Sequence, residues 1–418
     1  MNFSSLDLAP EILQALDACG YSKMTPIQQQ AIVPARRGKD ILANAQTGTG
    51  KTAAYTLPIL QQIVDNPKPT TPENARALIL TPTRELAEQL ANTIKAYAQF
   101  LPISVTALYG GVKMSSQEKK LKAGVDILIA TPGRLMEHIV QCNVNLSKVE
   151  FVVLDEADRM LDMGFITDVR SILQKTNKKR QTLLFSATIS RAVNELANKL
   201  LVNHEVVSVA KKNATADTVE HVVYPVEERR KTDLFIELLD EYNWFQVLVF
   251  TSTKAQADAL MRNLKKDKVK SSLCHGDKSQ GARRRALADF KSGKIQVLIA
   301  TEVAARGLDI QGLEYVVNYN LPYLAEDYVH RIGRTGRAGS KGHAISFVSR
   351  EEERSLDSIE RLIGNKIKRI NMPGYEVTNR DVLRKKLSKY GGSSRSNKSS
   401  QTTIIRNKDN HSGGRRKK

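Results

Sequence analysis

The chain has 418 residues, of which 41% are hydrophobic and 26% are charged, and its formal net charge is +20. This length exceeds one ordinary domain, and the composition is that of a soluble globular protein. The three cysteines lie far apart without a CxxC pair, which argues against a disulfide framework and a zinc site. The N-terminus has no leader pattern and no apolar run approaches ~18 residues, so we expect a cytoplasmic protein without a membrane segment.

Short runs rich in Val, Ile and Leu alternate with helix-length segments along most of the chain. Runs that are apolar on both faces are typical of parallel strands covered by helices on both sides. The predicted fold class is therefore α/β. The predicted strands are residues 40–44, 77–81, 126–131, 151–154, 182–186, 205–209, 247–251, 296–301, 315–318 and 343–348.

Two segments recur at one sequence offset. ALILTPTR at 77–84 resembles VLVFTSTK at 247–254, and DILIATPGR at 126–134 resembles QVLIATEVA at 296–304. Thr81 and Thr251 are 170 residues apart, and so are Thr131 and Thr301. Two matches at the same offset predict duplicated domains.

The domain boundaries follow from this repeat and from composition. We place domain one at 1–209, a small polar linker at 210–217, domain two at 218–370 and a basic tail at 371–418. From residue 384 onward the tail has 12 Lys or Arg and one acid. Such a segment cannot bury enough apolar surface to offset the entropy of ordering, so we expect it to be largely disordered. Its charge suits the phosphate backbone of a nucleic acid, although a purely solubilising tail is the alternative.

The first predicted strand leads into AQTGTGKT, which has the pattern of a phosphate-binding loop opening a helix. The glycines let backbone N–H groups face phosphates, Lys51 supplies positive charge, and the Thr52 hydroxyl can ligate Mg²⁺. The loop departs from GxxxxGK[ST] because Ala45 takes the first Gly position. A plain strand-to-helix turn is the alternative. The predicted nucleotide-binding residues here are Ala45, Gln46, Thr47, Gly48, Thr49, Gly50, Lys51 and Thr52.

The strand at 151–154 ends in the tetrad Asp155, Glu156, Ala157, Asp158. Acids at the carboxyl end of a buried parallel strand lie where α/β sheets bind ligands. We assign Asp155 to the metal, through water, and Glu156 to deprotonation of the water that attacks the γ-phosphate. An acidic helix N-cap would account for Asp155 alone.

The second domain has no phosphate loop at the matching offset and carries HRIGRTGRAG at 330–339 instead. Arginines three residues apart in a Gly-rich stretch can direct their guanidinium groups at one anion. We predict that Arg334 and Arg337 reach across the cleft as arginine fingers onto the γ-phosphate, so that hydrolysis needs closed domains. An RNA-facing patch is the alternative.

These motifs together resemble the DEAD-box RNA helicases from residue 3 to about residue 348, and most closely the bacterial RhlE-type subgroup. The resemblance implies two tandem RecA-like domains, each a parallel sheet flanked by helices, with ATP and Mg²⁺ as cofactors. GYSKMTPIQ at 20–28 resembles the family's adenine-reading motif, in which Gln28 would bind the adenine edge and Phe3 would stack on the ring. Tyr21 of this motif and Asp309 of ARGLD would also lie at the nucleotide.

The resemblance also assigns RNA-contacting and coupling residues. Short loops rich in Gly, Thr and Arg offer donors to phosphates and 2′-hydroxyls without reading bases. Ser186, Thr188, Asp158 and His330 would couple hydrolysis to strand separation. Glu302 stands where many relatives have Asp. The implied RNA contacts are Pro82, Thr83, Arg84, Gly110, Gly111, Thr131, Pro132, Gly133, Arg134, Thr251, Gln280, Arg283 and Thr301.

We therefore predict an RNA-dependent ATPase and helicase that closes two domains on single-stranded RNA and locally unwinds short duplexes. An ATP-gated RNA clamp or scaffold with weak unwinding is the alternative, because it needs the same residues. The DEAD tetrad and the adenine-reading motif argue against a DNA-repair helicase. No acceptor site or lid supports a P-loop kinase. We expect a monomer that reads the RNA backbone, with ribosomal precursor or RNA-decay complexes as candidate partners.

Overall fold

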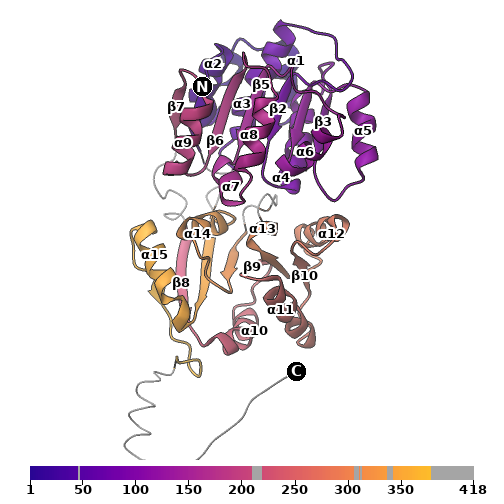
Figure 1. The fold of residues 1–418 in the computed structure, drawn as a ribbon. Helices are drawn as coiled ribbons and strands as arrows, with labels where there is room; N and C mark the ends of the chain where they lie inside the picture. The colour runs from indigo at the N-terminus through magenta and orange to yellow at the C-terminus, as the bar shows by residue number, and fades with distance from the viewer. Residues whose placement is uncertain (46–47, 210–218, 306–309, 311–312, 337–341, 378–418) are drawn as a thin grey trace, which may run out of the picture. The chain divides into compact units, whose positions relative to one another are not determined.

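The structure, a computed structural model, describes residues 1–45, 48–209, 219–305, 310, 313–336 and 342–377 (Figure 1). Two seven-stranded sheets form in this part of the chain, with strand orders β3-β4-β2-β5-β6-β1-β7 and β10-β11-β9-β12-β13-β8-β14. Every strand pairing within them is parallel. The predicted α/β class with two tandem RecA-like sheets is confirmed.

The first half alternates strands and helices, as crossover connections between parallel strands require. Its elements are η1 (Phe3–Ser5), α1 (Pro10–Ala18), α2 (Pro26–Arg36), β1 (Ile41–Asn44), α3 (Lys51–Asp65), β2 (Ala77–Leu80), α4 (Arg84–Tyr97), β3 (Val105–Leu108), α5 (Met114–Lys122), β4 (Ile127–Ala130), α6 (Pro132–Val140), β5 (Phe151–Asp155), α7 (Ala157–Asp162), α8 (Ile166–Gln174), β6 (Gln181–Ser186), α9 (Arg191–Leu200) and β7 (Glu205–Ser208).

The second half repeats this alternation of strands and helices. Its elements are β8 (Val219–Pro225), η2 (Glu228–Arg230), α10 (Lys231–Glu241), β9 (Val247–Thr251), α11 (Lys254–Lys266), β10 (Ser271–Cys274), α12 (Gln280–Lys291), β11 (Val297–Thr301), α13 (Glu302–Ala305), β12 (Tyr315–Asn318), α14 (Ala325–Ile332), β13 (Gly342–Val348), η3 (Arg350–Glu352), α15 (Glu353–Ile363) and β14 (Lys368–Arg369).

Alternate residues of each central strand enter different cores, because successive side chains of a strand point to opposite faces. In β1, Ile41 and Ala43 pack with helices α1–α4, while Leu42 packs with α6–α9. In β9, Val247 and Val249 join the core under α10 and α11, and Leu248 joins the core on the α12 face. Helices on both faces make the strands apolar throughout, which is the pattern that predicted them.

The offset of 170 residues is visible in three dimensions. The unit β2–α4 begins at Ala77 and the unit β9–α11 begins at Val247, and both strands occupy the third position of their sheets. Thr83 and Thr253 cap the following helices in the same way, since each hydroxyl accepts the N–H of the residue three positions later. The two matched segments are therefore structural equivalents.

The ten predicted strands are all present, with ends shifted by a residue or less in most cases. The sequence reading missed β3, β8, β10 and β14. β3 and β10 are edge strands with half-buried residues, so they lack a continuous apolar run. The predicted linker at 210–217 and the tail from residue 378 lie outside the described residues. No helix in the described ranges has the length and apolarity to cross a bilayer.

Candidate nucleotide and nucleic-acid site

The phosphate loop has the backbone that its glycines predicted. Gly48 and Gly50 have φ values of +82° and +91°, a left-handed conformation that favours glycine. Gly50 caps α3, so the N–H groups at the start of this helix point into the loop. Ala45 is buried after β1 and donates its N–H to the Ser186 carbonyl at 2.9 Å. Gln46 and Thr47 lie outside the described residues.

Gln28 is tied to this loop directly. Its Nε2 donates to the Gly50 carbonyl at 3.1 Å, and its Oε1 accepts the Thr25 N–H at 2.8 Å in a capping box that starts α2. A Cβ on Gly50 would lie 2.5 Å from that Nε2, so only glycine allows this approach. The amide thus links the start of α2 to the phosphate loop.

Phe3 and Tyr21 flank the Gln28 segment differently. The Phe3 N–H donates to the Ser22 carbonyl at 3.3 Å, which holds the N-terminus against the 20–28 stretch. The Phe3 side chain is only 3% exposed and packs in the core of the first half. Tyr21 is 46% exposed and meets the Tyr97 ring edge-on at 6.1 Å. Of the two rings, Tyr21 presents much the larger accessible surface.

The acids of the tetrad lie directly beneath the loop. Lys51 Nζ is 3.6 Å from Asp155 Oδ1, and both side chains are buried. Tyr55, one helical turn after Lys51, donates its hydroxyl to Asp155 Oδ2 at 3.1 Å. Burial raises the pKa of Asp155, and the neighbouring Glu156 adds to this effect while Lys51 opposes it. The site is therefore a buried cation–anion pair at the end of β5.

Glu156 adopts φ +57° and ψ +52°, a left-handed conformation in which few non-glycine residues occur. This turn places its carboxylate 3.2 Å from the Arg159 guanidinium. Burial raises the pKa of Glu156, but the charges of Arg159 and Lys51 outweigh that effect, so the pKa lies below its ordinary value. Glu156 is consequently ionised at neutral pH. Strained backbone at such a position is typical of functional sites.

Several buried polar atoms at this site belong to these two ion pairs but make no hydrogen bond within the described residues. They are Lys51 Nζ, Asp155 Oδ1, Glu156 Oε2 and Arg159 Nη1. Buried polar atoms that make no hydrogen bond are costly even within an ion pair, and they indicate a ligand that would complete them. Mg²⁺ prefers one or two carboxylates together with phosphate oxygens and waters, and Asp155 with the Thr52 hydroxyl fits that donor set.

Asp158 joins the tetrad to the SAT segment. Its Oδ2 accepts the N–H groups of Ala187 and Thr188 at 3.1 and 2.8 Å, and the Thr188 hydroxyl at 2.9 Å. Ser186 Oγ accepts the Asp158 N–H at 3.3 Å. Burial raises the pKa of Asp158, yet the basic side chains around it and the Thr188 hydrogen bond outweigh burial and lower it. The carboxylate is therefore ionised and holds two segments together.

Helix α14 and the segment that follows it contribute from the second half. Burial and the charge of Arg159 lower the pKa of His330 to about 4. Arg334 is 6% exposed, and its charge helps to lower the pKa of Glu156. Arg331 donates to Glu302 at 2.5 Å and to Asn318 Oδ1 at 3.1 Å, so it is committed to the interior of its own half. The remaining predicted residues of this group, Arg337 and Asp309, lie outside the described residues.

A cavity of about 630 Å³ gathers most of the predicted RNA contacts. Residues of both halves line it, including the loops after β2, β4 and β9. Its predicted lining residues are Pro82, Thr83, Arg84, Gly110, Thr131, Gly133, Arg134, Arg283 and Thr301. The matching segment 247–254 of the repeat contributes Ser252, Thr253 and Lys254 to the lining, whereas Glu137, Met163 and Phe165 were not predicted from the sequence.

The other predicted RNA contacts lie next to this cavity or behind it. Gly111 has φ +82°, and a side chain there would collide with the Arg84 guanidinium. Thr251 is completely buried and donates its hydroxyl to the Thr253 carbonyl at 3.3 Å, so it shapes the loop rather than lining it. Pro132 and Gln280 are not among the lining residues; they begin α6 and α12.

Ion pairs join the two halves beside the cavity. Arg283 Nη1 lies 3.0 Å from Glu85 Oε1, and Arg284 Nη2 lies 2.5 Å from Glu88 Oε1. Arg284 also donates to the Tyr109 hydroxyl at 3.2 Å. The Arg283 contact is nearly buried on both sides, so Arg283 contributes to closing the halves as well as lining the cavity.

Comparison with known proteins agrees with this geometry. Residues 25–196 match the DEAD/DEAH box helicase model, and residues 230–339 match the helicase conserved C-terminal domain. The ATP-dependent RNA helicase RhlB of Pseudomonas aeruginosa is 44% identical over 370 residues, which cover 87% of this chain and 93% of that protein. The chain belongs to the DEAD-box family of ATP-dependent RNA helicases.

Further relatives support the same placement of this helicase. The DEAD-box ATP-dependent RNA helicase CshA of Bacillus subtilis is 40% identical over 373 residues, covering 89% of this chain and 74% of that one. The structure of S. cerevisiae Dbp5 bound to RNA and ADP BeF3 superposes with a TM-score of 0.80 at 32% identity, covering 93% of this chain and 99% of that one. The placement in the RhlE-type subgroup stays a prediction.

Two residues of this helicase's site were not predicted from the sequence, namely Tyr55 and Arg159. Each lies three or four positions from a motif residue, on the same helix or turn. Tyr55 follows Lys51 by four positions and Arg159 follows Glu156 by three, a spacing at which helical neighbours meet. That spacing is the signal that could have found them.

Proposed function

We propose that Lys51, Asp155 and Glu156 form the ATP-hydrolysing centre of this RNA helicase, with Arg334 and Arg337 completing it from the second half. The observation that carries this proposal is the convergence of the buried Lys51 Nζ, Asp155 Oδ1 and Glu156 Oε2, which are ion-paired but make no hydrogen bond, next to a glycine loop at a helix start. Lys51 binds the β- and γ-phosphates, and Glu156 orients and deprotonates the attacking water.

Asp155 and the Thr52 hydroxyl would hold Mg²⁺, which neutralises charge on the β- and γ-phosphates when it is bound. The raised pKa of Asp155 is consistent with a cation site, because a nearby divalent charge stabilises the ionised carboxylate that burial disfavours. Gln28 and Tyr21 would contact the adenine. Gln28 retains one N–H and one lone pair beyond its two bonds to the protein.

The 630 Å³ cavity is the proposed RNA site. Thr, Gly and Arg residues make up much of its lining, and such residues offer donors to phosphates and 2′-hydroxyls rather than to base edges. RNA bound there would contact both halves at once. ATP binding would then favour a closed form that bends one strand and displaces its partner.

Asp158 would transmit the state of the nucleotide. It lies two residues after Glu156 in the chain and accepts two hydrogen bonds from Thr188. It also interacts with His330 through its charge. Phosphate release would loosen this junction and reopen the cleft. Unwinding would therefore be local and limited to short duplexes. We further infer a cytoplasmic, monomeric protein that serves ribosome biogenesis or RNA degradation, which rests on the sequence and the kind of relatives alone.

Steady-state ATP hydrolysis without nucleic acid, with RNA and with single-stranded DNA of the same sequence tests the proposal. Strong stimulation by RNA alone supports it, and equal stimulation by DNA overturns the assigned substrate. Strand separation of a short duplex is followed in parallel with ATP and with a non-hydrolysable analogue. Tight RNA binding without separation under either condition would favour the clamp.

A further inference from the structure

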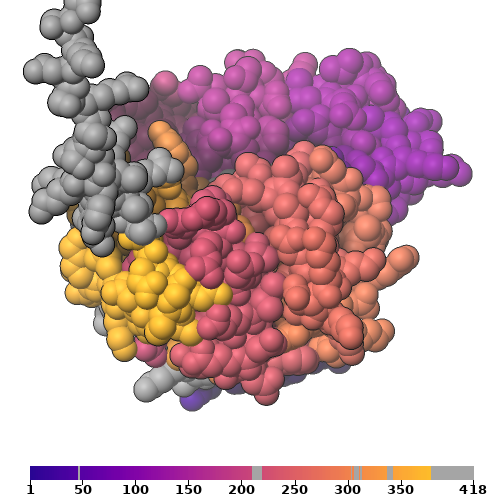
Figure 2. Space-filling view, turned by 90° about the horizontal axis from the view of Figure 1, so that it is seen from below, coloured from indigo at the N-terminus to yellow at the C-terminus, as the bar shows by residue number. Residues whose placement is uncertain are grey.

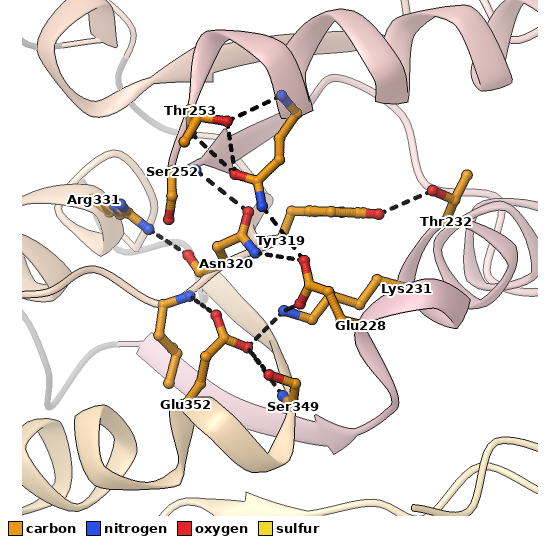
Figure 3. A network of polar contacts seen from close by, with 12 residues as sticks. Glu228, Lys231, Thr232, Ser252, Thr253, Tyr319, Asn320, Arg331, Ser349 and Glu352 are labelled. Atoms are coloured by element: carbon orange, nitrogen blue, oxygen red, sulfur yellow. Dashed lines mark hydrogen bonds and ion pairs between the residues drawn. The ribbon is translucent and has the colours of Figure 1, made fainter. Parts of the chain in front are cut away.

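A buried lysine organises polar side chains in the second half (Figure 3). The Lys231 side chain is fully buried, and its ammonium lies 2.6 Å from Glu352 and 2.7 Å from Glu228. A buried cation is tolerated only with charged partners of good geometry. The yellow last part of the described chain also lies against the red atoms from the region of α10 in the space-filling view (Figure 2). Lys231 thus joins the start of α10 to the segment that precedes α15.

Both carboxylates are held by further donors. Glu352 accepts the N–H groups of Leu321 and Ser349 at 2.9 and 3.0 Å, the second within a capping box. Glu228 Oε1 accepts the Asn320 Nδ2 at 3.1 Å. Neither carboxylate can rotate freely, because both are bound to the same fixed ammonium.

Glu228 fixes the orientation of the Asn320 side-chain amide. An ionised carboxylate can only accept hydrogen bonds, so the atom of Asn320 that faces it has to be the NH₂ group. The amide oxygen then points the other way, where it accepts the Ser252 N–H at 3.3 Å. Asn320 is 5% exposed and follows β12, while Ser252 is exposed and lines the cavity assigned to RNA.

We infer that Asn320, oriented by Glu228 and Lys231, is a positioning residue for the Ser252–Lys254 segment of the RNA site. The main chain of Asn320 has a second task, because its carbonyl accepts Arg331 Nη1 at 2.8 Å. That bond does not depend on the side chain. Changing the side chain should therefore disturb RNA binding and leave Arg331 and helix α14 in place. This inference rests on the proposed RNA site and names the residue that holds the Ser252–Lys254 segment of its lining in position.

An exchange of donor and acceptor tests the inference. Asn320→Asp places a carboxylate against Glu228, and the two repel each other. We expect the apparent KM for RNA in the ATPase assay to rise roughly tenfold, because one hydrogen bond is lost and one like-charge contact is introduced. The kcat at saturating RNA and the KM for ATP should stay within about twofold, because the Arg331 bond is to the main chain.

Adding Glu228→Gln to Asn320→Asp should restore the KM for RNA. The amide introduced at position 228 can donate to the carboxylate introduced at position 320, whose other oxygen still accepts the Ser252 N–H. The cluster keeps one net negative charge around Lys231 in both the wild type and the double variant. Simple loss of packing would not be repaired by a second substitution, so recovery shows that positions 228 and 320 act together through their charges and their hydrogen bond.

Two further variants distinguish failure of the positioning role from failure of the proposed RNA site. Thr232→Val removes the bond between Thr232 Oγ1 and the Tyr319 hydroxyl in the same region and should leave the KM for RNA unchanged. Lys254→Ala removes a cation from the cavity lining and should raise it. If Lys254→Ala acts while Asn320→Asp has no effect or is not rescued, the positioning role is wrong and the RNA site stands. If neither acts, the proposed RNA site fails, and the inference fails with it.

Discussion

Replacing Glu156 by Gln isolates the charge of one buried carboxylate. The amide keeps the volume and the left-handed backbone of Glu156, so the turn after β5 should survive. What it loses is the proton acceptor and the negative charge beside Arg159, 3.2 Å away. General-base catalysis contributes about 10²–10⁴-fold, equivalent to about 3–5 kcal/mol of barrier. We therefore expect kcat for ATP hydrolysis to fall by two to four orders of magnitude.

The affinities for ATP and RNA should not fall in the Glu156→Gln variant. Lys51 remains positive and loses one of the two acids near it, so ATP affinity should be kept or rise slightly. RNA affinity in the presence of ATP should likewise persist. Leaving Arg159 with only a neutral acceptor should cost about 1–3 kcal/mol of folding stability. Single-turnover hydrolysis at saturating RNA measures the first effect, and titration with a fluorescent ATP analogue measures the second.

A matched control comes from Glu150→Gln. Glu150 also pairs with a buried arginine, Arg76 at 2.8 Å, but lies at the other end of β5 from the phosphate loop. It should lower the melting temperature to a comparable degree and leave hydrolysis unchanged. Turnover of Glu156→Gln within threefold of wild type would refute its role as base. Equal loss of hydrolysis in both variants would show that the effect comes from stability instead.

Two other predictions concern charge. The pKa of His330 is lowered to about 4 in the folded protein, whereas the ordinary pKa of histidine is 6.5. Between these two pH values, His330 binds a proton in the unfolded chain but not in the folded one. Its contribution to stability is complete above about pH 6.5 and declines toward pH 4. The melting temperature should thus fall less between pH 7.5 and pH 5 in His330→Gln, and an identical decline in both proteins would contradict this. Removing residues 384–418, with 12 basic side chains and one acid, should weaken RNA binding and flatten its dependence on salt. Identical salt slopes in titrations of both chains would mean that the tail does not contact phosphate.

Much of the site could be predicted from patterns of adjacent residues in the sequence. Gly48 and Gly50 were assigned from the requirement for backbone N–H groups that turn toward a ligand, and their φ values agree. The tetrad was placed at the end of β5 because an apolar run ended there in acids. The offset of 170 residues predicted two equivalent sheets, since duplicated patterns of burial fold into duplicated structures. All these signals extend over a few adjacent residues.

Contacts between distant segments were decided by tertiary structure. Nothing near Asn320 in the chain indicates that it meets Ser252, 68 residues earlier, or that Glu228 turns its amide. Gln28 would have passed for a helix-surface residue, yet the packing of α2 against α3 brings it to Gly50. The edge strands β3 and β10 also escaped, because half-buried strands carry no continuous apolar run.

The sequence by itself determined which chemical groups this helicase has and the order in which they occur. Only the tertiary structure decided their hydrogen-bond partners and their ionisation. Asp155 and Glu156 are adjacent acids, but burial raises the pKa of one, and Arg159 with Lys51 lowers that of the other. The reason is physical: charge and hydrogen bonding depend on distances through space, and the chain fixes those distances only when strands far apart in sequence pair and pack.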